Sequence, residues 1–464
     1  MRRAAALALA GALAACTLEP AYHRPPAPVP PTVANSFGVA DQTARPPSWR
    51  AFFDDPRLVK VIERGLANNR DLPAAVANVE IARAQWLSQR AQLFPMLNGQ
   101  AGANLSQIPA AVALGSGAKG SIATNVYTAE LAIPSYEVDL FGRVRSLTKS
   151  AREQYFANQA ARDAAQIGLV GQLAQAWLTI GSDRSLLAVS NDTLGETSRS
   201  LELTRAKLQH GEAAQSDVDR AEGLVAQARF DVARYSTLVA QDKDALDLVA
   251  GTPIPNELLP DGVDDEVGIM GELPTGVASS ALLSRPDVLQ AEDQLKAANA
   301  NIGAARAAFF PNISLTAAGG VTSTALSGLF RAGAGTWSFA PQLVQPIFDA
   351  GKNRAGLLQA KAQRDLAQAN YEKAVQTAFR EVADALAQRD RIDAEVSAAE
   401  EQVGADLDAV RLIQAEYARG SASELDVLTA EASLYAAEET LTTTRLLKAS
   451  NLVSLYQALG GGLS

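Results

Sequence analysis

The stretch AARAAFFPNISLTAAGG, residues 304–320, changes its periodicity within a few residues. An alanine-rich run with helical character reaches a phenylalanine and Pro311, and alternation of apolar with polar or small residues follows. The stretch SQRAQLFPMLNGQAGANLS, residues 88–106, makes the same change at Pro95, 216 residues earlier. A helix is therefore expected to give way to a strand twice in this chain.

Four segments alternate in this way and predict strands of roughly ten residues in two hairpins. They lie near 97–106, 122–134, 312–322 and 336–344. Such strands, apolar on one face and polar on the other, have the length and pattern of a transmembrane β-barrel. A half-buried sheet of a soluble protein gives the same pattern, so the alternation alone leaves both possibilities open.

Two long blocks contain no proline, residues 135–252 and 347–464. Both are rich in good helix formers and surface residues. Each block is interrupted once by a glycine followed by a capping signal, at Gly211 and at Gly420. The run 142–209 would form a helix about 100 Å long. The sequence therefore predicts two helical hairpins longer than any compact domain.

A coiled-coil seam follows the returning helix of each hairpin, with apolar residues at alternating three- and four-residue spacings. Alanines at about half of its positions indicate closely packed helices, and core packing is the simplest role for such a stripe. In the first hairpin the seam is Val218, Ala221, Val225, Ala228, Val232, Tyr235 and Val239, resumed at Leu246 and Val249. In the second it is Val427, Ala430, Leu434, Ala437, Leu441 and Thr444, each 209 residues later.

Other landmarks keep the same offset, which indicates a tandem duplication of a unit near 210 residues, far longer than a solenoid repeat. The paired landmarks are Gly211 with Gly420, Asp217 with Asp426, and Gly251 with Gly460. We expect a first structural repeat at 49–260 and a second at 261–464. Each would contain a helix, a β-hairpin and a long helical hairpin in that order.

The N-terminal residues have a separate character. Residues 1–15 carry two arginines before a short apolar stretch that ends in small residues, the anatomy of a secretory signal peptide. The motif LAAC then ends at Cys16 and resembles a bacterial lipobox, in which the cysteine is lipidated. Cys16 is the only cysteine of the chain, so it has no disulfide partner. The proline-dense segment 16–48 is expected to be an extended tether from this lipid anchor.

Composition and motifs argue against several function classes. A formal charge of −10 argues against nucleic acid, and the absence of an apolar run near 18 residues argues against a helical membrane span. The glycine-rich stretch starting at Gly115 lies between two strands, so it predicts a hairpin loop and not a dinucleotide site. The SLTK match at 146–149 lacks its companion motifs. His23 and His210 offer neither a metal site nor a catalytic triad. No enzyme, metal or cofactor is expected, apart from the covalent lipid.

Four segments together resemble one family, the outer-membrane efflux lipoproteins of the OprM and NodT group of TolC-like outer-membrane factors. The most characteristic is LLSRPDVLQAEDQLKAANANIGAARAAFFPNISL, residues 282–315. The others are YHRPPAPVP at 22–30, FDDPRLVKVIERGLANNRDL at 53–72 and YEVDLFGRVRS at 136–146. The resemblance covers essentially the whole mature chain.

The resemblance implies a mixed α/β membrane protein that assembles as a homotrimer, with a 12-stranded β-barrel in the outer membrane and a long α-helical tunnel across the periplasm. It implies an outer-membrane exit duct of a tripartite efflux system in a Gram-negative bacterium. The partners would be a periplasmic adaptor and an inner-membrane pump, expected to be of the RND type. Four strands cannot close a barrel, so the residues themselves also require oligomerisation.

The resemblance also assigns the gate. In YARGSASELDVL, residues 417–428, Asp426 matches an aspartate that rings the constriction, while Tyr417 and Asp217 match a latch between neighbouring helical pairs. The tip turns at Gly211 and Gly420 would dock the adaptor. Ala422 and Thr429 stand where relatives have an arginine and a second aspartate. The alternative for Asp217 and Asp426 is that they only cap their helices.

A periplasmic coiled-coil scaffold lipoprotein without channel activity is the main alternative function. It would explain the helical blocks, but not four alternating segments placed symmetrically within a duplication. A secreted adhesin or filament would need no lipobox. The sequence does not disclose the exported substrate.

Overall fold

The computed structural model describes residues 17–30, 47–110, 112, 117, 119–263 and 279–462 of the chain. It contains two compact units, each of which combines segments from both halves of the sequence. The strand unit comprises Met1–Pro26, Asn78–Asn158 and Ala291–Tyr371, and the hairpin unit comprises Ala27–Ala77, Gln159–Gln290 and Glu372–Ser464.

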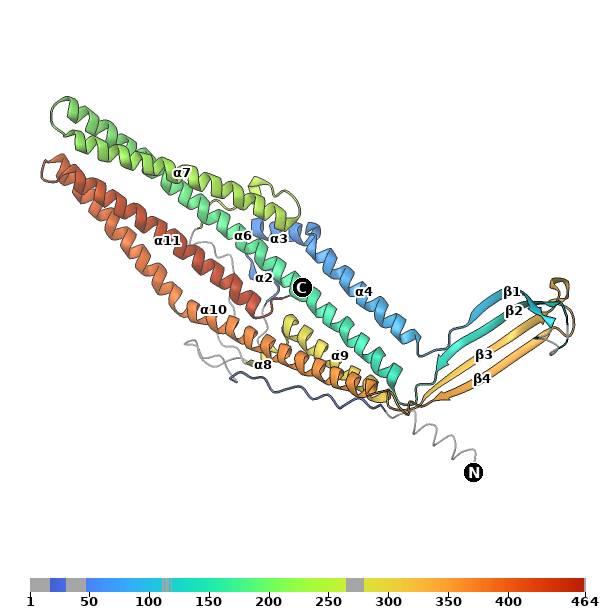
Figure 1. Ribbon diagram of the computed structural model, residues 1–464. Coiled ribbons are helices and arrows are strands. Elements are labelled where there is room, and N and C mark those ends of the chain that lie inside the picture. The colour runs from blue at the N-terminus through green and yellow to red at the C-terminus, as the bar shows by residue number, and fades with distance from the viewer. Residues whose placement is uncertain are drawn as a thin grey trace. The chain divides into compact units, whose positions relative to one another are not determined.

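The strand unit holds a four-stranded antiparallel sheet in chain order, as the alternating segments predict (Figure 1). Its strands are β1 (Asn98–Pro109), β2 (Ser121–Glu137), β3 (Asn312–Ser323) and β4 (Gly335–Val344). Pairing of β2 with β3 joins the hairpin of the first repeat to the hairpin of the second. Strands β1 and β4 therefore form the two edges of the sheet.

The strand register separates a polar face from an apolar face. Partnered residues share a face, so Gln100 lies beside Glu130, and Thr128 lies beside Thr322. The polar face also carries Asn104, Ser314, Thr316, Ser338 and Gln342. The apolar face carries Tyr127, Leu131, Ile313, Leu315, Val321, Trp337, Phe339 and Leu343. Trp337 is 81% exposed in the single chain, so this face has no cover of its own.

Two helices lead into the sheet where the sequence changes its period. Helix α4 (Asp71–Ala91) precedes β1, and α9 (Pro286–Ala307) precedes β3. Each helix ends a few residues before its proline, because the residue before a proline disfavours helical geometry. At the second junction Phe310 stacks on Phe141, with ring centroids 4.7 Å apart.

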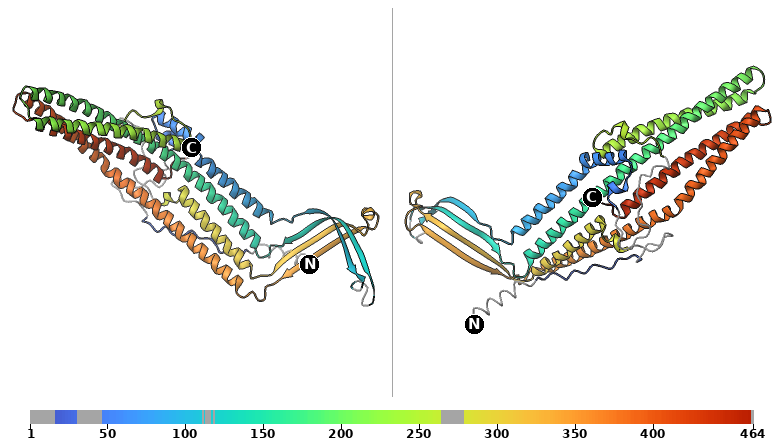
Figure 2. Two further views of the ribbon diagram at one scale, coloured as in Figure 1. Left: turned by 45° about the horizontal axis from the view of Figure 1, so that its top comes forward. Right: turned by 180° about the vertical axis from the view of Figure 1, so that it is seen from behind.

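Four long helices follow the strands as two hairpins. The first consists of α6 (Arg143–Gln209) and α7 (Gln215–Ala250), and the second of α10 (Lys352–Ala418) and α11 (Glu424–Ala458). Both α6 and α10 run for 67 residues without a break. In both views of Figure 2, α7 lies alongside α6 and α11 lies alongside α10.

The predicted seams are buried or half-buried throughout both returning helices. In α7 the most buried members include Val218, Ala221, Val225 and Tyr235, and in α11 they include Val427 and Ala437. The seams therefore form the core of the hairpins, as the spacing predicts.

Short elements complete the hairpin unit near the ends of α7 and α11, beside the middle parts of α6 and α10; this level is called the base of the hairpins below. They are α2 (Trp49–Phe52), α3 (Pro56–Asn68), the 3-10 helix η1 (Asn256–Leu258) and α8 (Ser279–Leu282), while the 3-10 helix η2 (Leu326–Gly328) belongs to the strand unit. Phe52 stacks on Tyr456 with centroids 4.5 Å apart. Helix α3 buries Leu58, Val61, Ile62 and Gly65, while Val59 and Leu66 are half-buried.

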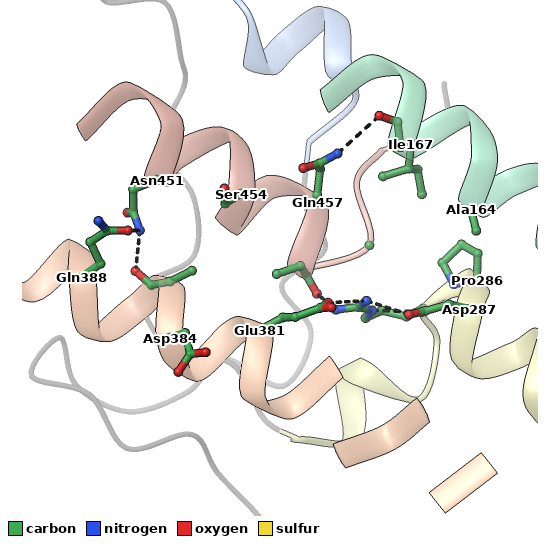
Figure 3. A pocket seen from close by; sticks show the side chains of 15 residues that line it. Ala164, Ile167, Pro286, Asp287, Glu381, Asp384, Gln388, Asn451, Ser454 and Gln457 are labelled. Atoms are coloured by element: carbon green, nitrogen blue, oxygen red, sulfur yellow. Dashed lines mark hydrogen bonds and ion pairs between the residues drawn. The ribbon is translucent and has the colours of Figure 1, made fainter. Parts of the chain in front are cut away.

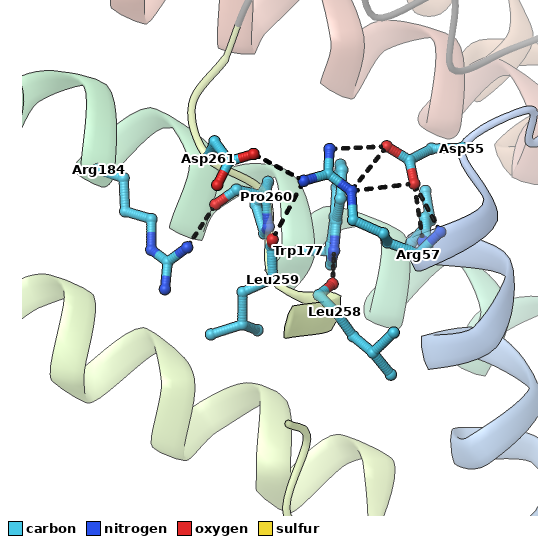
Figure 4. Close-up of polar contacts among 9 residues, drawn as sticks. Asp55, Arg57, Trp177, Arg184, Leu258, Leu259, Pro260 and Asp261 are labelled. Carbon is cyan, nitrogen blue, oxygen red and sulfur yellow. Dashed lines mark hydrogen bonds and ion pairs between the residues drawn. The ribbon is translucent and has the colours of Figure 1, made fainter. Parts of the chain in front are cut away.

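A polar network fixes α3 to the chain after α7 (Figure 4). Asp55 caps α3 by accepting the N–H of Arg57 at 2.6 Å, and the Arg57 guanidinium reaches Asp261 at 3.0 Å. Close by, the indole of Trp177 donates to the carbonyl of Leu258 at 2.8 Å, and Arg184 donates to the carbonyl of Pro260 at 2.7 Å. Side-chain donors thus form hydrogen bonds with backbone carbonyls of the irregular segment that follows α7.

The segment 17–26 is extended, as its prolines predict, and within the strand unit it is bound to α9 and α6. Arg24 forms an ion pair with the buried carboxylate of Glu292 at 2.6 Å, and Tyr22 donates to the same side chain at 3.1 Å. Lys149 of α6 pairs with Glu19 at 2.8 Å. The predicted tether is therefore attached to α9 and α6 by specific charged contacts that its composition did not reveal.

Candidate functional site

The two tip turns, residues 210–214 and 419–423, connect the helices of each hairpin. Gly211 has a φ of 76° and Gly420 a φ of 78°, a left-handed conformation that favours glycine. A Cβ at either position would have nothing within 4 Å. The backbone conformation, and not crowding, therefore requires glycine at both tips.

Asp426 caps α11. Its carboxylate accepts the N–H of Ser423 at 2.8 Å and the hydroxyl of Ser423 at 2.6 Å, and the Ser423 hydroxyl oxygen accepts the N–H of Asp426 at 3.3 Å. These bonds, first of all the one from the Ser423 side chain, hold the pKa of Asp426 below its usual range. The carboxylate is exposed and ionised at neutral pH. It therefore serves as the predicted cap and also presents a negative charge at the tip.

Asp217 holds the equivalent position on α7 with a weaker cap. Its carboxylate accepts the N–H of Ala214 at 3.0 Å and pairs with Arg220 at 3.2 Å. Ala214 has no side-chain oxygen to return a bond, so half of the capping box is missing.

Tyr417 lies in a polar cluster that joins the two hairpins near their tips. Its hydroxyl donates to Glu424 at 2.9 Å, and the ammonium of Lys207 lies 3.7 Å from the centroid of its ring. Thr204 of α6 also donates to Glu424. Burial raises the pKa of Tyr417 and the Glu424 carboxylate adds to the rise, against the opposing effect of Lys207.

Within the single chain, the two residues assigned to the latch have different partners. The structure gives Tyr417 the partners Glu424 and Lys207, whereas Asp217 is engaged with Ala214 and Arg220. The sequence prediction missed Glu424 because an acidic residue in a first helical turn is common, and its role depends on a contact across 220 residues of chain. Thr429, one of the departures from the family pattern, donates to the carbonyl of Leu425 in its own helix at 2.7 Å.

Two further hydrogen bonds cross between the hairpins away from the tips. Tyr235 of α7 donates to Glu439 of α11 at 2.7 Å, and the hydroxyls of Ser190 and Tyr435 lie 3.0 Å apart. Burial, first of all, raises the pKa of Tyr435 to about 12. Burial and the hydrogen bond to Glu439 also raise the pKa of Tyr235, so both tyrosines are neutral hydrogen-bonding groups at physiological pH.

Carboxyl groups with raised pKa values also occupy the helical hairpins. Burial raises the pKa of Glu431 and of Glu438, and other carboxylates nearby add to the rise. Burial and a hydrogen bond with Asp242 raise the pKa of Asp183 to about 7. Asp183 lies on α6 and Asp242 on α7, so this contact joins the two helices of the first hairpin.

At the base of the second hairpin, Arg285 is a buried clamp. It pairs with Asp287 at 2.7 Å and with Glu381 at 2.8 Å, and it donates to the carbonyl of Ala458 at 2.7 Å. Burial alone would lower the pKa of Arg285, but these two carboxylates outweigh burial and raise it. A cavity of about 520 Å³ opens beside this clamp, lined also by Gln388, Asn451 and Gln457 (Figure 3).

Other sequence predictions stand as follows. Cys16 and the signal peptide lie outside the described residues. Within the part that is described, no helix combines the length and the apolar character needed to cross a membrane. The same residues contain no group of three or more histidine, cysteine or acidic side chains placed to hold a metal ion.

The sequence profile of the family described as outer membrane efflux protein matches residues 61–252 and 277–461. Among curated proteins, the probable efflux pump outer membrane protein TtgC of Pseudomonas putida is 42% identical over 455 residues, which are 97% of this chain and 93% of that protein. The outer membrane protein OprJ of Pseudomonas aeruginosa is 39% identical, over 98% of this chain and 95% of that protein.

Solved structures give the same result. The open state of the MtrE outer membrane channel of Neisseria gonorrhoeae superposes with a TM-score of 0.87 at 38% identity, covering 97% of this chain and 99% of that one. A membrane protein from Pseudomonas aeruginosa reaches a TM-score of 0.89 at 39% identity, covering 96% of this chain and 98% of that one.

Proposed function

Because the chain belongs to the outer membrane efflux protein family, we propose that three copies form a passive exit duct through the outer membrane. The observation that carries this proposal is the open sheet. Strands β1 and β4 are unpaired edges within the chain, and exposed edges of this length are rare unless another chain pairs with them. Three copies with four strands each give a closed barrel of twelve strands.

The two faces of the sheet support a membrane barrel. The apolar face, with Trp337, Phe339 and Leu343 largely exposed in the single chain, suits lipid contact. The polar face suits a water-filled lumen. A dimer would make an eight-stranded barrel, whose interior is filled by side chains, so a conducting duct needs at least a third copy.

The helical hairpins would then form the periplasmic tunnel. The tip turns at Gly211 and Gly420 lie where each 67-residue helix ends and its returning helix begins, and they would dock the periplasmic adaptor of an inner-membrane pump of the RND type. The exposed Asp426 carboxylate from three copies would ring the closed end. Tyr417, Glu424 and Lys207 would hold the two hairpins of each copy together there.

The N-terminal anchor of the proposed duct is inferred from the sequence. Cys16 would carry the lipid anchor in the outer membrane, and the contacts of Glu19, Tyr22 and Arg24 would fix the chain that follows the anchor. No other cofactor is required. The duct would catalyse no reaction.

A periplasmic scaffold lipoprotein is the competing function. It would account for the hairpins but leaves the two-faced sheet without a purpose. The test is the mass of the detergent-solubilised protein by light scattering, corrected for detergent, combined with conductance in planar lipid bilayers. A trimer that conducts is the expected result. A monomer without conductance would favour the scaffold.

The gate is tested in the same bilayers. Three Asp426 carboxylates near one axis attract cations, so the wild-type channel should be blocked by multivalent cations. Asp426→Ala should weaken that block, because the ring loses its charge, and should affect stability only through the hydrogen bonds lost at the start of α11. Unchanged block in Asp426→Ala would leave the residue as a helix cap alone.

A further inference from the structure

Charged side chains are almost absent from the sheet. The four strands contain no lysine or arginine, and their acidic residues are Glu130 and Glu137, both in β2. Glu137 is the last residue of its strand and forms a two-bond pair with Arg143, at 2.8 Å and 2.5 Å. Its charge is therefore neutralised, whereas Glu130 lies near the middle of the strand and is bound by a neutral group.

That neutral group is Gln100 on the neighbouring strand. The amide of Gln100 donates to the Glu130 carboxylate at 2.5 Å, and the two residues are direct partners in the β1–β2 register. On the other side, Glu130 is partnered with Gly320 of β3, which has no side chain to cover the carboxylate. The Glu130 carboxylate is therefore held on the polar face by Gln100, and its partner residue on β3 does not cover it.

We propose that Glu130 is a charge-selecting residue of the duct, placed in the barrel far along the chain from the Asp426 gate. The inference rests on the proposed function, because the polar face becomes the lumen only when three copies close the barrel. Three Glu130 side chains would then lie at one level, forming a ring of carboxylates in the lumen. Such rings favour cations over anions in membrane pores.

The size of the barrel makes this ring effective. Twelve strands about 4.8 Å apart and tilted by about 40° give a backbone radius of about 12 Å. A glutamate side chain of about 4 Å brings each carboxylate to about 8 Å from the axis, close to the Debye length of about 8 Å at physiological salt. Three such charges enrich monovalent cations on the axis about two- to threefold. Cationic solutes should therefore enter the barrel more readily than anionic solutes of the same size.

A purely structural role is the competing explanation, since the Gln100–Glu130 bond also supports strand pairing. The substitution Glu130→Gln separates the effect of the charge from the effect on strand pairing. Glutamine has nearly the same size as glutamate and keeps an oxygen that can accept the hydrogen bond from Gln100. Asn104 lies on the polar face and Asn125 on the opposite face of the sheet. Adding Asn104→Asp to Glu130→Gln returns one carboxylate per chain to the polar face. Adding Asn125→Asp makes the same amide-to-carboxylate change on the opposite face and serves as the control.

The experiment measures reversal potentials of the full-length trimer in planar bilayers under a potassium chloride gradient at low ionic strength. Because the ring enriches cations and depletes anions by the same factor, Glu130→Gln should lower the cation-to-anion permeability ratio by at least about four- to ninefold, in both the wild-type and the Asp426→Ala background. Asn104→Asp should restore the ratio and Asn125→Asp should not. A conducting Glu130→Gln channel with an unchanged ratio would overturn this inference and leave the duct intact. Absence of conductance from the wild-type protein would overturn the proposed function and the inference together.

Discussion

Asn69 and Arg285 hold equivalent positions in the two repeats, 216 residues apart. The Asn69 amide donates to the carbonyl of Val249 near the end of α7 at 2.8 Å, and the Arg285 guanidinium donates to the carbonyl of Ala458 at the end of α11 at 2.7 Å. The accepting residues are themselves 209 residues apart. In each repeat, the residue at this position therefore donates a hydrogen bond to a carbonyl near the end of the returning helix. The donor is a neutral amide in the first repeat and a charged guanidinium in the second.

The tips of the hairpins differ more. Ser423 of the second tip replaces Ala214 of the first and completes a capping box. Glu424 and Tyr417, which bond to each other, stand where the first repeat has Gln215 and Leu208. The duplication thus preserves the helices and turns, whereas the two repeats contribute different polar residues to the contact at the tips: Tyr417 and Glu424 from the second, and Lys207 and Thr204 from the first.

The largest predicted effect compares two glycines with similar backbone geometry. Gly251 at the base has a φ of 70° and Gly211 at the tip a φ of 76°. A Cβ at Gly251 would collide with the carbonyl of Asn68, whereas one at Gly211 meets nothing. Gly251→Ala should cost about 3 kcal/mol or more, and Gly211→Ala only the conformational cost of about 1 kcal/mol. Thermal unfolding of the detergent-solubilised protein measures both, and equal losses would contradict the distinction.

The next effect tests the base contact itself. Arg285→Met removes the buried cation and leaves Asp287, Glu381 and the Ala458 carbonyl without their partner, which should cost about 3 kcal/mol. Asn69→Ala loses neutral hydrogen bonds, including the cap that it provides to α4 through the N–H groups of Asp71 and Leu72, and should cost about 1–2 kcal/mol. Denaturation midpoints check the order. A smaller loss for Arg285→Met would mean that the clamp is not what fixes the second base.

A pH effect is expected from Asp183 in the first repeat, at a position without an ionisable counterpart in the second. The pKa of Asp183 is about 7 in the folded protein and about 3.9 in the unfolded chain. The folded state therefore binds the proton more tightly, so this contribution to stability is complete below pH 4 and is lost as pH rises toward 7. The equivalent positions of the second repeat, Ile392 and Asn451, do not titrate.

Asp183→Asn removes this titration and supplies a direct measurement. Relative to wild type, the variant should gain about 1–2 kcal/mol of stability between pH 4 and pH 8, a figure reduced to allow for solvent screening at a partly exposed site. Unfolding midpoints across this range check it. A stability difference that does not change with pH would show that Asp183 does not hold the proton.

The smallest effect exchanges the caps of the two tips. Ala214→Ser should complete the capping box with Asp217 and stabilise the first hairpin by about 0.5–1 kcal/mol, and Ser423→Ala should weaken the second by about 1 kcal/mol. Hydrogen exchange of the amides in the first turns of α7 and α11 resolves changes of this size. Exchange should become slower in α7 of Ala214→Ser and faster in α11 of Ser423→Ala. Changes in the same direction would contradict the difference in capping between the two tips.

The sequence predicted the long helices and the strands because their apolar residues recur at regular spacings. The seams of α7 and α11, the strand alternation and the change of period at Pro95 and Pro311 are all local signals, and the structure confirms them. The contacts that complete the site depend on distant segments. The Glu424 bond with Thr204, the docking of Arg24 on Glu292 and the pairing of Gln100 with Glu130 arise only when the chain folds. No spacing in the sequence specifies them.

The central claim is that β1 of one copy pairs with β4 of the next, and cysteine cross-linking tests it most directly. In a Cys16→Ser background, which contains no other cysteine, cysteine pairs are scanned along β1 and β4 in place of residues on one face, and oxidised in outer membranes. The account predicts a register at which denaturing electrophoresis shows a covalent species of three chains and none larger. Cross-links formed only within a single chain, or a ladder extending beyond three chains, would contradict it.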